Sequence, residues 1–339
     1  MKRLYKICIF LSLLGGTLAA PAFAGHTYLQ PASEPAAYRF DADITNNSLA
    51  ISPNEHWAAA SNSSQPRVRI VDLKNGDLRQ ELDGFVTPRN LLFTPDGKRL
   101  LISDSTLGIV AVVDTASWKQ VSQIAVGAGA FGTAIDPKGQ RVYVNNEAAD
   151  TVTVIDLAMM RTIAVLTGFA EPRQGIKFSP DGRQVFVTNF KGDRITVIDS
   201  DTLEPNGEIT GFDGIRAVSV SANGKTLYAA NSKSNSIAVV DLEKRRITDN
   251  VPVGRDPYGA ALSPNGTLVY SGDKVDNTLT VVDTTTRKVV GKVVGFDEPR
   301  QAITFTRDGR QAYVLNQDLS VAVVDLGALR IANTIGVRR

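Results

Sequence analysis

The sequence predicts an all-β protein, a seven-bladed β-propeller of four-stranded antiparallel blades. Two markers that recur in phase carry this prediction. An aspartate that ends a Val- and Ile-rich run recurs at spacings of 42 or 43 residues, at Asp72, Asp114, Asp156, Asp199, Asp241, Asp283 and Asp325. A second polar residue keeps the same step, at Asn62, Asp104, Asn146, Asn189, Asn231, Asp273 and Asn316. A repeat of this length is typical of propellers, solenoids and other repeat arrays.

The content of each repeat favours the propeller over the solenoid. Each unit contains four short runs rich in Val, Ile, Tyr, Phe and Thr, which indicate strands. In the fourth unit these are Gly175–Phe178, Gln184–Thr188, Arg194–Ile198 and Asn206–Thr210. Because four antiparallel strands make a whole sheet, each repeat is expected to be one blade.

A short turn joins the first two strands of each unit, with the sequence Ser-Pro-Asp-Gly at 179–182. Proline presets φ at one corner and glycine accepts the left-handed position, so a tight hairpin is expected. The first copy, Ser52-Pro53-Asn54-Glu55, lacks the glycine. The recurring aspartate that ends the third strand is expected to cap the next turn by accepting backbone N–H bonds.

The N-terminus has the pattern of a secretory signal peptide. Three basic residues within the first six precede an apolar run at 7–14, and Ala-Phe-Ala at 22–24 is a small-residue cleavage pattern. The run is too short to span a bilayer of about 30 Å. We therefore expect cleavage after Ala24, a periplasmic mature protein and no membrane anchor. Residues 25–44 are expected to be a lead-in segment, and residues 45–339 the propeller.

Composition without the signal gives no sign of a nucleic-acid partner. The chain has 37 Lys and Arg against 35 Asp and Glu, and residues 1–24 contain three of the bases and no acid, which leaves 34 against 35. A net charge near zero excludes a global attraction to nucleic acid or anionic lipid. The single cysteine, Cys8, lies in the signal. No disulfide is expected, and a monomer is favoured.

The clearest repeats identify a family. The runs Val185-Phe-Val-Thr-Asn189 and Ile195-Thr-Val-Ile-Asp199, together with Val142-Tyr-Val-Asn-Asn146, resemble the YVTN-repeat β-propeller family with its lactonase-like members. This resemblance covers essentially all of the chain after the signal and implies the fold. It does not imply one activity, because similar repeats occur in lactonase-like proteins, in the haem-binding propeller of cytochrome d1 enzymes, in subunits of periplasmic amine dehydrogenases, in metallochaperones and in surface proteins.

One face of the propeller carries the candidate binding residues. The connections from the fourth strand to the next first strand, and from the second strand to the third, share this face and vary in sequence, as binding loops do. Four of them end in an arginine where the chain enters the innermost strand, so we call this side the arginine face. The candidate ligand-binding residues around the channel mouth are Arg89, Arg173, Arg216, Arg300, Asn46, Asn90, Gln174, Tyr258 and Gln301.

Two interpretations of the arginines remain open at this stage. Their planar guanidinium groups suit a carboxylate or a phosphate, which favours an anion site at the mouth. Alternatively, each arginine bonds loop carbonyls or pairs with a nearby acid, namely Asp213, Glu171, Asp297 or Glu298.

The sequence gives no metal site and no cofactor. Only two histidines occur, His26 beside the cleavage site and His56 in the first turn, which is too few for a zinc site. The only acid in the predicted inner strands is Asp136, at the far turn, so a calcium site in the channel is not expected. No catalytic motif is present, and the catalytic residues are unknown.

We therefore expect a periplasmic binding or scaffold protein whose partner is an anionic small molecule or an acidic periplasmic protein. One alternative is an enzyme or an enzyme subunit, either a lactonase-like hydrolase or a companion of a quinone or haem dehydrogenase. Another is a structural or adhesive surface protein. The missing channel carboxylates and histidines favour binding over catalysis.

Overall fold

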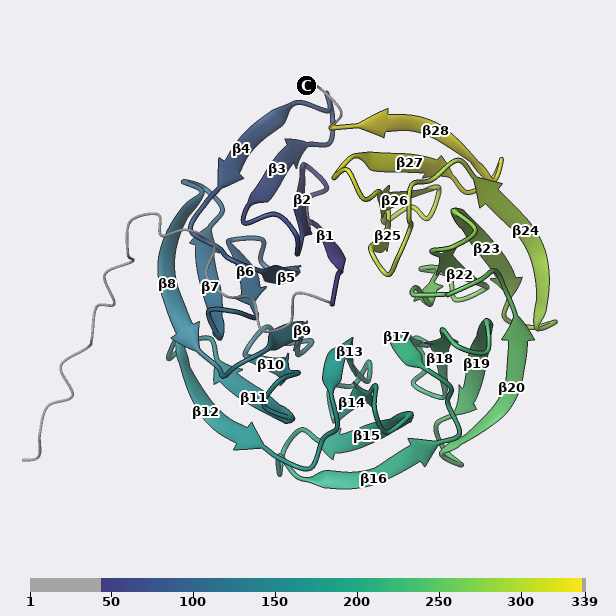
Figure 1. The fold of residues 1–339 in the computed structure, drawn as a ribbon, viewed down its shortest axis with the longest axis horizontal. Coiled ribbons are helices and arrows are strands. Elements are labelled where there is room, and N and C mark those ends of the chain that lie inside the picture. Colours follow the sequence, from purple (N-terminus) through teal and green to yellow (C-terminus); the bar gives the residue numbers. More distant parts are fainter. Residues whose placement is uncertain (1–43, 337–339) are drawn as a thin grey trace, which may run out of the picture. The chain divides into compact units, whose positions relative to one another are not determined.

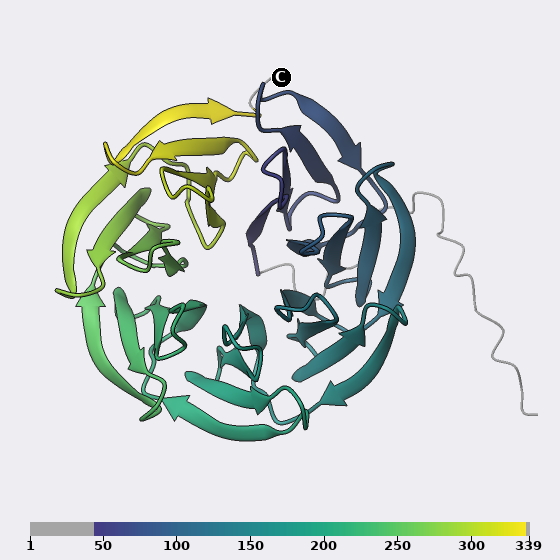
Figure 2. The same cartoon turned by 180° about the vertical axis from the view of Figure 1, so that it is seen from behind.

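In the computed structural model, residues 44–336 form 28 β-strands arranged in seven four-stranded antiparallel sheets. The structure describes these residues, which lie within the unit Pro35–Arg339. The seven sheets stand around a central opening, as Figure 1 and the reverse view in Figure 2 show. The predicted seven-bladed propeller is thus confirmed. The predicted signal peptide and residues 25–43 of the predicted lead-in lie outside the described residues.

Each blade is built from four consecutive strands, and the chain runs outward within every blade. The innermost strands, which ring the channel, are β1 (Asn47–Ile51), β5 (Pro88–Phe93), β9 (Ala130–Ile135), β13 (Pro172–Phe178), β17 (Ile215–Val220), β21 (Ala261–Leu262) and β25 (Ile303–Phe305). The second strands are β2 (Trp57–Asn62), β6 (Arg99–Asp104), β10 (Arg141–Asn146), β14 (Gln184–Asn189), β18 (Thr226–Asn231), β22 (Leu268–Asp273) and β26 (Gln311–Leu315).

The outer half of each blade follows the same order. The third strands are β3 (Val68–Asp72), β7 (Ile109–Asp114), β11 (Thr151–Asp156), β15 (Arg194–Asp199), β19 (Ser236–Asp241), β23 (Thr278–Asp283) and β27 (Val321–Asp325). The outermost strands are β4 (Leu78–Leu82), β8 (Lys119–Ala125), β12 (Arg161–Leu166), β16 (Pro205–Thr210), β20 (Arg246–Pro252), β24 (Lys288–Val294) and β28 (Arg330–Ile335). Within residues 44–336, no helical segment could cross a lipid bilayer.

The tight turns between the first and second strands form as predicted. In the fourth blade the Gly182 amide donates to the Ser179 carbonyl at 2.9 Å, and Gly182 has a φ of 74°. The first blade has no glycine at this position, and Glu55 takes the left-handed conformation itself, with a φ of 58°. Its amide makes the same bond to the Ser52 carbonyl at 2.8 Å. The turn therefore keeps its shape at the cost of some backbone strain.

The aspartates that end the third strands cap the turns that follow them, as predicted. Asp199 Oδ1 accepts the amides of Asp201 and Thr202, both at 2.9 Å. These backbone bonds lower the pKa of Asp199. A carboxylate that accepts a following amide is found in all seven blades. The repeated aspartate is thus a structural residue.

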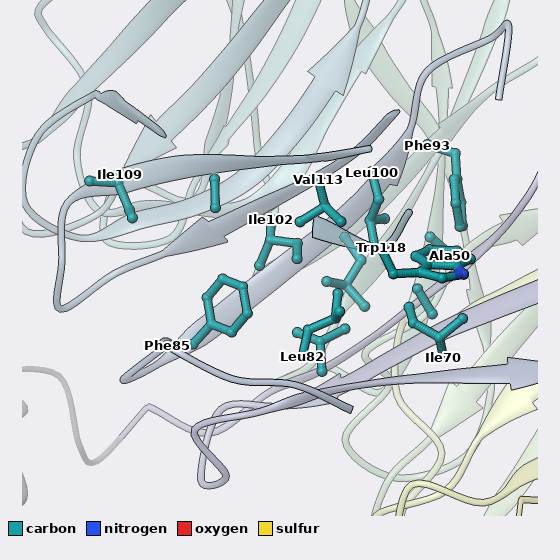
Figure 3. Close-up of a cluster of buried hydrophobic side chains, with 14 residues drawn as sticks. Ala50, Ile70, Leu82, Phe85, Phe93, Leu100, Ile102, Ile109, Val113 and Trp118 are labelled. Carbon is teal, nitrogen blue, oxygen red and sulfur yellow. The ribbon is translucent and has the colours of Figure 1, made fainter. Parts of the chain in front are cut away.

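Apolar side chains fill the spaces between neighbouring blades. Figure 3 shows the cluster between the first two blades, where Ile70 and Leu82 pack with Leu100, Ile102 and Val113. Trp118 caps this cluster and meets Trp57 edge to face, with ring centroids 5.8 Å apart. Because each sheet packs on two neighbours, both faces of its second and third strands are largely buried.

The ring closes without a shared strand. The seventh blade, β25 to β28, comes entirely from the C-terminal end of the chain, and the first blade, β1 to β4, from the N-terminal end. Leu315 and Val321 of the seventh blade pack with Leu49 of the first. The side-chain amide of Asn62 donates to the Gln317 carbonyl at 3.2 Å. Side-chain contacts therefore hold this junction, because no loop crosses it.

Candidate functional site

The polar residues that end the second strands hold the loops of the arginine face. Asn189 Oδ1 accepts the amide of Ala170 at 2.9 Å, and Asn316 Oδ1 accepts that of Asp297 at 3.0 Å. Asp104 accepts the amides of Val86 at 2.7 Å and Thr87 at 3.0 Å. In each case the bonded loop is the one that enters the innermost strand of the same blade. The second repeat marker therefore positions the segment that carries the arginine.

A further set of bonds ties the loops of the fourth, fifth and seventh blades to the preceding blade. Asp150 accepts the Glu171 amide at 2.7 Å, Asp193 accepts the Gly214 amide at 2.7 Å, and Asn277 accepts the Glu298 amide at 2.9 Å. The acceptors lie in the connections between second and third strands, and both kinds of connection therefore share one face, as the sequence predicted. Two anchors per loop give the channel mouth a defined geometry.

A row of alternating arginines and aromatic rings runs across four neighbouring blades. The guanidinium carbon of Arg173 lies 4.0 Å from the Phe190 ring centroid, and that of Arg216 lies 4.2 Å from the same ring. The guanidinium carbon of Arg216 also lies 4.4 Å from the centroid of Tyr258, and that of Arg300 lies 5.4 Å from the same centroid. Cation–π attraction holds such stacked groups in place. We call these five residues the arginine–aromatic row.

Among the described residues, Arg216, at the centre of the row, bonds a hydroxyl and no carboxylate. Its Nε donates to the Ser232 hydroxyl at 3.2 Å, and no ion pair to it occurs within the described chain. Burial is the main cause that lowers the pKa of Arg216, and the positive charges of Arg173 and Arg300 act in the same direction, while Tyr258 and Asp256 oppose them. A guanidinium remains protonated nonetheless. The centre of the row is therefore a half-buried positive charge that a bound anion would stabilise.

The flanking arginines of the row are paired. Arg173 donates to Glu171 at 3.0 Å, and Lys191 contacts the same carboxylate at 2.8 Å. Arg300 donates to Glu298 at 2.9 Å and also contacts Thr45. Of the four acids considered from the sequence, Glu171 and Glu298 thus pair with their arginines.

Arg89 lies apart from the row, above Phe131, with its guanidinium carbon 4.7 Å from the ring centroid. It is 1% exposed. It donates to the Ile44 carbonyl, to Ser105 Oγ at 3.0 Å and to Asn46 Oδ1 at 3.1 Å. The loop-bonding interpretation therefore describes Arg89.

The predicted amide residues lie at the same end of the channel, and most bond protein groups. Asn46 is buried and donates to the Arg89 carbonyl at 2.6 Å. Asn90 donates to Thr133 Oγ1 at 2.6 Å. Gln301 donates to the Asn47 carbonyl at 2.8 Å, while its carbonyl oxygen is buried without a partner in the described part of the chain. Gln174 lines the channel, as do Asn90 and Gln301.

Glycine permits the close approach of inner strands that brings the row together. A Cβ atom at Gly175 would lie 2.4 Å from the Arg216 carbonyl and 2.3 Å from Thr188 Oγ1. Such distances are shorter than any real contact, so no larger residue fits there without displacing β13 or β17. The stacking of Arg173 and Arg216 on Phe190 thus depends on a glycine in the inner strand.

Two residues of functional interest were missed from the sequence. Phe190 follows the Asn marker of the fourth unit, and its role depends on an arginine from the next blade. Lys177 lies on β13 and is the only charged side chain that lines the channel among the described residues. The signal for Lys177 was visible, because the other six units carry Ala, Leu, Ala, Ser, Ala and Thr at the same distance before the turn.

No group of three or more His, Cys, Asp or Glu side chains within residues 44–336 is arranged to hold a metal ion. His56 lies in the turn between β1 and β2, at the end of the blade away from the arginine face. His26 lies outside the described residues.

The fold and the site together define a seven-bladed β-propeller with a basic, aromatic-lined channel mouth. Two family models match parts of the chain: the cytochrome D1 heme domain matches residues 94–215, and the seven-bladed lactonase propeller matches residues 200–294. These matches confirm the resemblance to lactonase-like repeat propellers. No curated protein sequence matches the chain.

Solved structures share the fold. A chain of Kuenenia stuttgartiensis hydrazine synthase is similar with a TM-score of 0.72 and 20% sequence identity, over 82% of this chain and 94% of that chain. At this level of identity, the similarity establishes the propeller architecture and does not extend to activity.

Proposed function

We propose that this protein binds an anionic small molecule through a carboxylate or phosphate group at Arg216. The proposal rests on one observation: the Arg216 guanidinium lies between Phe190 and Tyr258 and has no acidic partner among residues 44–336. The guanidinium carbon lies over both rings and its one hydrogen bond to the described residues uses Nε, so its terminal N–H groups can bond a ligand. A carboxylate or a phosphate matches this geometry with two parallel bonds.

The neighbouring groups support an anion rather than a cation or a neutral ligand. Lys233 and Lys274 lie near the same rings, with nitrogens 6.0 Å and 5.8 Å from the centroids of Phe190 and Tyr258, and Lys233 is paired with Asp193 at 3.4 Å. Arg173 and Arg300 add positive charge, although Glu171 and Glu298 compensate them in part. Because Arg216 is partly enclosed, a small acid group reaches it more easily than a broad protein surface does. We place the protein in the periplasm, because of its signal-type N-terminus.

Replacement of Arg216 by Gln tests this proposal. Charge-assisted hydrogen bonds contribute about 1.5–3 kcal/mol each, so R216Q should weaken binding of a suitable anion by about tenfold or more. Titration calorimetry with inorganic phosphate, citrate and acetate measures the effect. The matched control is R255Q, which removes the same charge from an exposed side chain on this face and should bind as the wild type does.

Equal affinity of R216Q and wild type for the best of these anions would contradict the proposal. Binding of an acidic peptide with no binding of small anions would instead support a protein partner.

A second candidate function, an enzyme or an enzyme subunit, is favoured by the family-model matches. Histidine is the usual axial ligand of haem iron, and the only histidine of residues 44–336, His56, lies at the other end of its blade. The described part of the mouth therefore supplies no histidine for a haem. Tyrosine can also bind haem iron, but Tyr258 is packed against Arg216 and Arg300. Titration with haem, and release of acid from a γ-lactone, are the assays that decide for or against this candidate.

A further inference from the structure

The channel has a second charged position, at the end away from the arginine face. Lys177 is the only lysine, arginine, aspartate or glutamate that lines the channel cavity of about 460 Å³ among the described residues. It also lines a smaller cavity of about 360 Å³, whose walls include Pro180 and Pro264 from the turns at the opposite face. Lys177 therefore lies where the channel meets this second opening.

The side chain of Lys177 has no polar partner among residues 44–336. It is exposed to the channel, and no hydrogen bond or ion pair joins its ammonium group to the described residues. The positions that correspond to it in the other six blades are occupied by small or uncharged residues: Ala50, Leu92, Ala134, Ser219, Ala261 and Thr304. The surrounding strands lower the pKa of Lys177 by burial. An unpaired ammonium enclosed by neutral walls favours the approach of one negative charge.

An unsatisfied hydroxyl lies beside it. Ser219, on the adjacent strand β17, borders both cavities that Lys177 borders. Its hydroxyl oxygen is buried and has no hydrogen-bond partner in residues 44–336. A serine side chain has three staggered positions, so rotation about its Cα–Cβ bond can turn the hydroxyl toward the cavity. A second donor is then available to a group held by Lys177.

The rest of the smaller cavity is largely apolar. Phe178, Val220 and Leu262 line it together with Pro180 and Pro264. Its volume lies within the range of about 300–1,000 Å³ of small-molecule sites. A single cation suits a singly charged group, and apolar walls suit a hydrocarbon body.

We propose that Lys177 and Ser219 form a second binding site, at the far end of the channel, for a small monocarboxylate with an apolar body. The carboxylate accepts hydrogen bonds from the Lys177 ammonium and the Ser219 hydroxyl, and the hydrocarbon part lies against Phe178, Val220 and Leu262. The site is independent of the proposed anion site at Arg216, because the two lie at opposite ends of the inner strands.

Titration calorimetry with hexanoate, hexanol and hexylammonium tests this assignment. Hexanoate should bind the wild-type protein, while hexylammonium should not and hexanol should bind more weakly. K177M keeps a long apolar side chain and removes the charge, so it should lower hexanoate affinity by about tenfold or more. S219A should lower it by a smaller factor. The matched control is K225M, which removes an exposed lysine near the next turn on the same face and should bind hexanoate as the wild type does.

Three results would overturn the proposal. They are undiminished hexanoate binding by K177M, equal binding of hexanol and hexanoate, and no hexanoate binding at about 10 mM, where even weak sites fill. R216Q should retain the hexanoate site at Lys177, because that site lies at the other end of the inner strands. A loss of hexanoate binding in R216Q with normal binding in K177M would assign the carboxylate to the arginine face instead, and would leave the proposal for Arg216 standing.

Discussion

Arg300 is the most enclosed arginine of the arginine–aromatic row, with a side chain that is 5% exposed. It bonds Glu298 and Thr45, and Thr45 precedes the first blade. Arg216 shares the same ring but forms no ion pair among the described residues, and Asp256 acts on it only at longer range. Two arginines at equivalent places in the repeat thus have different surroundings, and we expect different consequences when each is replaced.

The variant R300Q should lower the free energy of unfolding by about 1–3 kcal/mol, because glutamine cannot replace both bonds and Glu298 loses its cation. Urea unfolding measures this loss. R255Q is the control, since its side chain is 68% exposed and exposed ion pairs contribute little. A variant R300Q that unfolds like the wild type but binds phosphate more weakly would identify Arg300 as a ligand residue instead.

At the scale of the element, the polar residue that ends each second strand has two chemical forms. Asn146 donates to Thr151 at 3.0 Å and to Thr153 at 2.8 Å. Asp273 takes the same place in the sixth blade and accepts the hydroxyls of Thr278 at 3.0 Å and Thr280 at 2.5 Å. Threonine hydroxyls can donate or accept, so the same pocket holds either residue.

Burial raises the pKa of Asp273, and this has a consequence for stability against pH. The folded state holds the proton more tightly than the unfolded chain does. The free energy of unfolding therefore falls as the pH rises from the unfolded-state pKa, near 3.8, through the raised pKa of the folded state. Above the raised pKa of the folded state, Asp273 is charged in both states, and the full cost of burying this charge lowers the free energy of unfolding.

The variant D273N should remove this cost and increase stability at neutral pH by on the order of 1 kcal/mol, with the gain shrinking as the pH falls toward 4. Urea unfolding between about pH 4 and pH 7 measures the trend. D199N should show the opposite sign, because backbone bonds lower the pKa of Asp199 and the stabilisation by its carboxylate is lost as the pH falls. A D273N variant that is less stable at pH 7 than at pH 4, relative to wild type, would contradict this account.

At the scale of the whole molecule, the junction between the seventh and first blades differs from the other six. Elsewhere a loop joins each outermost strand to the next innermost strand, so neighbouring blades are covalently connected. At this junction only side-chain packing and a few hydrogen bonds connect the two blades. Among them, the side-chain amide of Asn47 donates to the Leu315 carbonyl at 3.4 Å, and that of Asn62 donates to the Gln317 carbonyl. We expect local opening of the ring to begin here.

The variant L315A should destabilise the protein by about 2–5 kcal/mol, as truncation of a fully buried leucine does. It should also increase amide hydrogen exchange in β1 to β4 and β25 to β28 more than in the other blades. L100A is the matched control: Leu100 is equally buried, but lies in the cluster between the first two blades. Uniform exchange over all blades in L315A would show that the junction is no weaker than the rest.

The sequence by itself determined the repeat, the number of blades, the turns between first and second strands and the capping role of Asp199 and its equivalents. These features depend on contacts within a few residues, and residue type and spacing therefore encode them. The sequence also placed the arginines on the face where the chain enters the innermost strands, because the position of a loop in a propeller follows from strand order alone.

The tertiary structure alone decided which side chains meet. Phe190 and Arg216 belong to different blades, and their stacking depends on how closely β13 and β17 approach at Gly175. In the same way, only the structure distinguishes Arg216 from Arg89. Arg216 forms no ion pair among the described residues, whereas Arg89 donates to the Ile44 carbonyl. The repeat fixes the position of an arginine along the chain, whereas radial packing fixes its neighbours, and the neighbours decide whether its charge is available to a ligand.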